Sequence, residues 1–178
     1  MLKAEIRKLY LQKRLELDSN TLQALNKKIA KRFFQFLPDH IFTIHIYLPM
    51  HERGEINSWP IIYKLWEMNL NTVVPVMQAG DASLSCRVLT PEIKLEKNIW
   101  GVPEPVAAQP ADKNVIELVI MPLLACDKRG FRVGYGKGYY DRFLAGFEEQ
   151  PLKVGFCFFE PVHEISDIHA ADIPMDIC

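Results

Sequence analysis

The residues from Val115 to Ala125 read VIELVIMPLLA and are almost all apolar. This run predicts a strand that is buried on both faces, as is typical of a central strand in a parallel sheet. Helix-like and strand-like segments alternate on either side of it. We therefore predict a single three-layer α/β domain over residues 1–178, with a mostly parallel sheet and helices on both faces. In such sheets, ligands bind beyond the carboxyl ends of the strands.

Hydrophobic periodicity predicts the other elements. One helix is expected from about Leu2 to Glu16 and a second from Ser19, as its cap, to Phe36. A third is expected after Ser58, as its cap, with Pro60 in the first turn. A short helix is expected around Tyr139–Phe147, and strands over residues 41–50, 72–77, 84–89 and 153–159. Residues 91–114 contain four prolines and predict a long irregular loop.

Composition narrows the classes of function. The chain is 49% hydrophobic and 24% charged, which is typical of a soluble globular protein. Its net charge of -1 gives no basic field for nucleic acid. The short basic cluster at residues 27–32, which would suit an RNA-associated interaction protein, predicts a solvated helix face instead. No apolar run could span a membrane or act as a signal peptide, so a cytoplasmic protein is expected.

The four cysteines, Cys86, Cys126, Cys157 and Cys178, are far apart in the sequence and form no CxxC pair. This spacing indicates neither a zinc site nor a disulfide framework. Scattered thiols of this kind are typical of a reducing compartment.

The stretch Gly134–Asp141 reads GYGKGYYD and follows the apolar run, just before the predicted short helix. Glycines let the backbone approach a ligand closely, while backbone N–H groups and the Lys137 ammonium favour an anion. The stretch is neither a Walker A sequence nor a dinucleotide fingerprint. On spacing alone, a phosphate site and a plain glycine-rich turn with a solvated lysine are about equally supported. Asp141 could equally interact with the helix dipole.

The segment MPLLACDKRGFRVGYGKGYYDRFL resembles the signature of the 5-formyltetrahydrofolate cyclo-ligase family, also called methenyltetrahydrofolate synthetase. KAEIR, YLPMHERGEIN, NIWGVPEP and ADIPMD resemble further motifs of the family, so the resemblance covers nearly the whole chain. It implies an enzyme that uses ATP and Mg²⁺ to convert 5-formyltetrahydrofolate to 5,10-methenyltetrahydrofolate through a phosphorylated formyl group. The implied partner is this small molecule, and a monomer is expected.

The resemblance also implies residue roles. The implied ATP contacts are Lys3, Arg7, Gly134, Tyr135, Gly136, Lys137, Gly138, Tyr139 and Tyr140. Lys137 and Arg132 are the implied catalytic residues, and Asp141 and Asp176 the implied Mg²⁺ ligands. The implied folate contacts are Leu48, Met50, Glu55, Trp100 and Tyr140. Glu55 would pair with the aminopyrimidinone edge of the pterin. The plain alternatives are a solvated helix face for Lys3 and Arg7, and core packing for the apolar and aromatic residues.

Two features depart from the family pattern. Tyr135 stands where many members carry Arg or a small residue, so Arg132 or Lys128 would have to supply the missing charge. The sequence ends at Cys178, shortly after ADIPMD, where relatives often continue, so contacts from such a tail are expected to be absent or unnecessary. A catalytically inactive nucleotide- or folate-binding module of the same fold is the alternative function. The joint presence of Lys3, Arg7, Glu55, Lys137 and Asp141 favours the enzyme.

Overall fold

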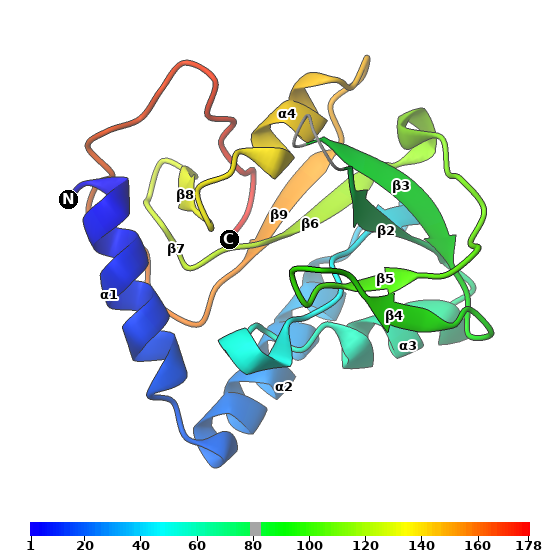
Figure 1. Ribbon diagram of the computed structural model, residues 1–178, viewed down its shortest axis with the longest axis horizontal. Helices are drawn as coiled ribbons and strands as arrows, with labels where there is room; N and C mark the ends of the chain where they lie inside the picture. The colour runs from blue at the N-terminus through cyan, green and yellow to red at the C-terminus, as the bar shows by residue number, and fades with distance from the viewer. Residues whose placement is uncertain (79–82) are drawn as a thin grey trace.

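A five-stranded sheet forms the centre of the protein, with strand order β3–β2–β1–β6–β9 (Figure 1). The computed structural model describes residues 1–78 and 83–178. Neighbouring strands are parallel except at one edge, where β3 runs antiparallel to β2. The strands are β1 (Thr43–His45), β2 (Asn71–Met77), β3 (Leu84–Leu89), β6 (Leu118–Pro122) and β9 (Leu152–Phe156). The predicted mostly parallel α/β fold is therefore confirmed.

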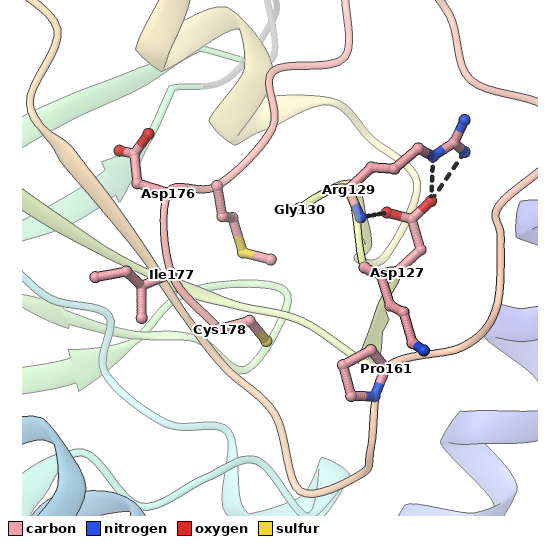
Figure 2. A pocket seen from close by; sticks show the side chains of 9 residues that line it. Asp127, Arg129, Gly130, Pro161, Asp176, Ile177 and Cys178 are labelled. Atoms are coloured by element: carbon pink, nitrogen blue, oxygen red, sulfur yellow. Dashed lines mark hydrogen bonds and ion pairs between the residues drawn. The ribbon is translucent and has the colours of Figure 1, made fainter.

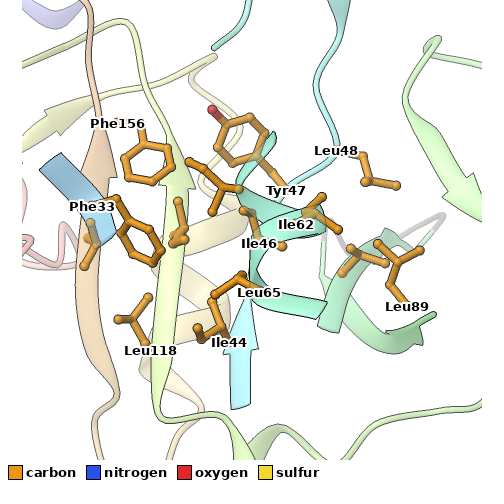
Figure 3. Packing of buried hydrophobic residues seen from close by; sticks show 14 of the residues in the cluster. Phe33, Ile44, Ile46, Tyr47, Leu48, Ile62, Leu65, Leu89, Leu118 and Phe156 are labelled. Carbon is orange, nitrogen blue, oxygen red and sulfur yellow. The ribbon is translucent and has the colours of Figure 1, made fainter. Parts of the chain in front are cut away.

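Helices cover both faces of this sheet because the side chains of each strand alternate between the faces. Leu118 and Ile120 of β6 pack with α2 (Ser19–Phe36) and α3 (Trp59–Glu67). Figure 3 shows this cluster around Phe33 and Leu65. Val119 and Met121 point to the opposite face and pack against α4 (Tyr139–Ala145).

Smaller elements surround the sheet. α1 (Lys3–Leu15) packs on a short ladder of β7 (Ala125–Cys126) and β8 (Arg132–Val133). A second ladder joins β4 (Leu95–Lys97) to β5 (Pro103–Pro105), and 3-10 turns cover His51–Arg53 and Lys113–Val115. No helix in the described ranges is both long and apolar enough to cross a membrane.

Several predicted boundaries and the predicted cap of α2 were wrong. Asp18, not Ser19, caps α2, because its carboxylate accepts hydrogen bonds from the Asn20 and Thr21 amides at 2.9 and 3.0 Å. Ser58 is the N-cap residue of α3, as predicted, but its side chain makes no capping hydrogen bond; its hydroxyl donates to the Tyr47 carbonyl oxygen at 2.7 Å.

The strand expected over residues 41–50 is limited to β1, and those expected over 115–125 and 153–159 are limited to β6 and β9. The region 91–114 is not irregular throughout, since it contains the β4–β5 ladder and a 3-10 turn. Proline is tolerated in β5 because a two-stranded ladder leaves one edge of each strand unpaired.

Candidate functional site

The glycine loop, residues 134–138, connects β8 to α4, and α1 lies against it. Arg7 Nε donates a hydrogen bond to the Gly134 carbonyl oxygen at 2.9 Å. Gly136 has φ of +86°, and a Cβ atom there would lie 2.9 Å from the Arg7 guanidinium carbon. The predicted proximity of Arg7 to the glycine loop is therefore present, and glycine at position 136 permits it.

Lys137 is exposed at the tip of this loop. Its carbonyl oxygen accepts a hydrogen bond from Arg142 Nη2 at 2.6 Å, which fixes the backbone of the loop at this position. Its ammonium forms no hydrogen bond or ion pair with any residue of the described ranges. Gly138, with φ of +69°, then leads into Tyr139 at the start of α4. The charged ammonium of Lys137 therefore lies in solvent.

Lys3 lies one turn before Arg7 on α1 but is engaged elsewhere. Its amide donates to Asp167 Oδ1 at 2.7 Å, and its ammonium pairs with Asp172. Burial opposes ionisation of Asp172, but the hydrogen bonds from Lys3 and from the His169 amide, together with the Lys3 charge, hold the pKa of Asp172 below its usual value. A phosphate at Lys3 would have to compete with this carboxylate.

Arg132 and Asp141 form a largely buried ion pair beneath the loop. Arg132 Nη2 donates to Asp141 Oδ1 at 2.7 Å, and its Nη1 donates to the Ile173 carbonyl oxygen at 2.6 Å. The Ile173 amide donates to the same Oδ1 at 3.2 Å. Oδ2 of Asp141 has no hydrogen-bond partner among residues 1–78 and 83–178, which leaves one carboxylate oxygen able to contact a cation.

Asp176 has different partners from Asp141. Its carboxylate accepts from the amide and the ammonium of Lys153, at 2.7 and 2.9 Å. Figure 2 shows Asp176 beside a cavity of about 280 Å³ between the C-terminal segment and the turn at residues 127–130. Within the described ranges, no three acidic, histidine or cysteine side chains form a metal-binding group. Asp141 and Asp176 thus belong to no such group in the described ranges and share no hydrogen-bond partner.

A hydrogen-bonded chain connects the glycine loop to Glu55. The Tyr135 hydroxyl donates to Glu55 Oε1 at 2.7 Å, and Arg14 Nη2 donates to that hydroxyl at 2.7 Å. The Met50 amide donates to Glu55 Oε2 at 2.7 Å. Burial raises the pKa of Glu55, although these hydrogen bonds oppose the shift. Tyr135, predicted among the ATP contacts, thus places its hydroxyl on the predicted pterin carboxylate.

Arg14 was missed as a site residue. Only 4% of it is exposed, and its Nε has no hydrogen-bond partner. The signal was present in the sequence, because Lys3, Arg7, Tyr10 and Arg14 form one stripe of α1 at helical spacing. The same helix face that supplies Arg7 to Gly134 supplies Arg14 to Tyr135.

The remaining predicted folate contacts differ in exposure. Leu48 is buried in the main core cluster, in agreement with its plain alternative. Trp100 is 47% exposed in the turn between β4 and β5, where its amide donates to Asn98 Oδ1 at 2.9 Å. Lys97 pairs with Glu52, which connects this hairpin to the segment that carries Met50 and Glu55.

Tyr140 lies against a buried histidine that was also missed. The ring centroids of Tyr140 and His45 are 5.8 Å apart, and the Tyr140 hydroxyl and both His45 ring nitrogens are buried without partners. Burial lowers the pKa of His45 to about 3, so the ring is neutral. A lone histidine in an apolar strand gave no functional signal in the sequence.

Comparisons with known proteins all find relatives of one enzyme family. A family model described as the 5-formyltetrahydrofolate cyclo-ligase family matches residues 1–177. A Caenorhabditis elegans protein named probable 5-formyltetrahydrofolate cyclo-ligase is 29% identical to this chain over 136 residues. The matched residues cover 69% of this chain and 66% of that protein, which is just under two thirds of its length.

Two solved structures named 5,10-methenyltetrahydrofolate synthetase are also similar. The one from Mycoplasma pneumoniae has a TM-score of 0.80 at 25% identity, covering 99% of this chain and 97% of its own. The one from Aquifex aeolicus has a TM-score of 0.80 at 29% identity, covering 99% and 89%. The structural match therefore extends over all the elements described above.

Proposed function

The chain belongs to the 5-formyltetrahydrofolate cyclo-ligase family, and on this premise we propose that it converts 5-formyltetrahydrofolate and ATP to 5,10-methenyltetrahydrofolate, ADP and phosphate. We propose that it does so with Mg²⁺, as a monomeric single domain in the cytoplasm. The observation that carries the proposal is that consecutive residues of the glycine loop contact the two predicted halves of the site. Gly134 binds Arg7, on the predicted phosphate side, and Tyr135 binds Glu55, on the predicted pterin side.

The reaction needs ATP because the formyl oxygen of 5-formyltetrahydrofolate is a poor leaving group. Transfer of the γ-phosphoryl group to that oxygen gives an imidate-like phosphate. The neighbouring anilinic nitrogen then attacks the carbon, and phosphate leaves. The protein's contribution to such a transfer is mainly orientation and charge stabilisation.

On the phosphate side, we propose that Arg7 and Lys137 supply the positive charges. The backbone of Gly134, Gly136 and Gly138 is proposed to lie close to the phosphates. The exposed ammonium of Lys137 has no competing partner in the described ranges, which suits it to the transferred group. Lys3 can bind phosphate only if its ion pair with Asp172 is broken. Arg132 is placed to act through Asp141 rather than on phosphate directly.

The residues around Asp141 fit a magnesium ion, because the metal needs only one or two carboxylates and takes its other ligands from phosphate and water. Oδ2 of Asp141 is available for this, whereas Oδ1 is held by Arg132 and Ile173. When bound, the ion would neutralise charge on the phosphates. Asp176 is the weaker proposal, since Lys153 already pairs with it.

On the folate side, we propose that Glu55 binds the aminopyrimidinone edge and that Tyr135 and Met50 hold its carboxylate in place. Tyr140 and Trp100 are proposed as aromatic contacts. The half-exposed Trp100 ring is free to lie over a ligand, whereas the buried Leu48 contributes through the core behind the site.

The test is a spectroscopic assay for the methenyl product with purified protein, with and without ATP and Mg²⁺. Product that depends on both supports the proposal, whereas binding of ATP and folate without product would indicate an inactive binding module. Lys137→Ala is expected to lower kcat by roughly 10²-fold or more, as for loss of a transition-state charge contact, with no change in melting temperature. Equal losses of activity and thermal stability would make Lys137 a structural residue.

A further inference from the structure

Three of the four cysteines lie together in the folded protein, although their spacing in the sequence suggested scattered thiols. The sulfur atoms of Cys126 and Cys178 are 2.9 Å apart. Cys157 is beside them, and its thiol donates to the Leu124 carbonyl oxygen at 3.5 Å. Cys86 lies elsewhere, in the core cluster under α4.

The backbone on both sides holds the Cys126–Cys178 pair in place. The Gly155 amide of β9 donates to the Ile177 carbonyl oxygen at 2.8 Å, and the Met175 amide donates to the Gly130 carbonyl oxygen at 2.8 Å. These bonds fix the C-terminal segment, residues 172–178, against β9 and the 127–130 turn. A disulfide has an S–S bond of about 2.05 Å, so the sulfurs need to approach by only about 0.9 Å.

The two sulfurs differ in access. Cys126 is fully buried, whereas Cys178 is exposed and lines the cavity shown in Figure 2. Lys128, Asp127 and Asp176 line the same cavity, so its wall is polar and carries charges of both signs. A small reagent can therefore reach the Cys178 sulfur first, while the Cys126 sulfur lies buried behind it.

We propose that Cys126 and Cys178 form an oxidation site that a small disulfide, such as oxidised glutathione, converts to a protein disulfide. The Cys178 thiolate attacks the reagent and releases one thiol, which leaves a mixed disulfide on Cys178. The Cys126 sulfur then attacks the Cys178 sulfur and releases the second thiol. Two protein thiols are oxidised, one reagent disulfide is reduced, and both protons end on the released thiols.

The bond would connect β7 to the C-terminal segment, and this segment also supports the candidate site. Ile173 of the segment accepts from Arg132 and donates to Asp141. The bridge would therefore restrain a segment that leads directly to the proposed metal ligand. This inference rests on the thiol geometry and is independent of the proposed cyclo-ligase activity.

The experiment treats the purified full chain with oxidised and with reduced glutathione, followed by peptide mapping without reduction. We expect one linkage, between the Cys126 and Cys178 peptides, with loss of two thiols per chain. The Cys86→Ser variant should form the same bridge, and so should Cys157→Ser. The Cys178→Ser variant should form none.

A second measurement tests whether the bridge fits the native fold. The oxidised wild-type protein should melt at a higher temperature than the reduced one, and Cys178→Ser should show no such difference. A bridge through Cys157, a stable glutathione adduct on Cys178, linkage only between chains, or a bridge that lowers the melting temperature would each overturn the proposal.

Discussion

Replacement of Tyr135 by Phe tests which side of the candidate site this residue serves. The change keeps the ring and removes the hydroxyl that donates to Glu55 Oε1 and accepts from Arg14 Nη2. Both partners are more than 90% buried, so water does not readily replace the lost contacts. Loss of a hydrogen bond to a buried charged group costs about 1.5–3 kcal/mol, and 1.4 kcal/mol corresponds to about tenfold in affinity.

We therefore expect KM for 5-formyltetrahydrofolate to rise roughly tenfold to a hundredfold, because Glu55 loses one of the two groups that orient it. KM for ATP should stay nearly constant, since the Arg7 contact to Gly134 does not involve the phenol. Steady-state kinetics with each substrate varied in turn measures both constants.

Tyr47→Phe is the matched control for this substitution. The Tyr47 hydroxyl of the wild-type protein is also buried, and it donates to a single acceptor, the Ile56 carbonyl oxygen, at 3.0 Å. We expect Tyr47→Phe to lower the melting temperature without a selective change in either KM. A rise in KM for ATP as large as that for folate in Tyr135→Phe would refute our placement of Tyr135 and restore its role as an ATP contact.

Three further substitutions have distinct expected outcomes. Gly136→Ala should weaken ATP binding more than folate binding, because the new methyl group meets the Arg7 guanidinium and the backbone has φ of +86°; calorimetric titration of each ligand separates the two. Asp141→Asn should raise the Mg²⁺ concentration needed for half-maximal activity, and an unchanged Mg²⁺ dependence would exclude Asp141 as the ligand. His45→Leu should make the protein less sensitive to acid. The folded pKa of about 3 lies below the ordinary value, so the unfolded chain binds the proton first, and stability falls as pH drops from about 6.5 towards 3. Urea unfolding at pH 7 and pH 4 measures this loss, which should shrink in the variant.

Local sequence patterns were sufficient for the framework of the fold. The apolar run at residues 115–125 marked β6, a buried interior strand of the sheet, and helical periodicity located α1 and α2 to within one residue at each end. The glycine stretch directly precedes α4, as predicted, but it follows the short strand β8 of an unpredicted ladder rather than the buried strand β6. These features depend on neighbours within a few residues, and such patterns can be read directly from the chain.

Contacts between distant residues could not be predicted in this way. Lys3 and Asp172 are 169 residues apart, and Arg14 and Tyr135 are 121 apart, so no periodicity relates them. Either partner alone has an ordinary interpretation as a solvated charge or a loop tyrosine. The resemblance to the family identified most of the candidate residues but could not reveal which of them are held by internal partners.

The charges around Tyr135 explain why a neutral residue suits this position. The guanidinium carbon of Arg53 lies 5.2 Å from the Tyr135 ring centroid, and that of Arg14 lies 5.8 Å from it. Glu55 is the only carboxylate that contacts the Tyr135 hydroxyl in the described ranges. An arginine at position 135 would place a third cation between two others, with one carboxylate to balance them, and like charges at this range repel. The phenol instead accepts from Arg14 and donates to Glu55, so it binds a cation and the carboxylate without adding a third positive charge.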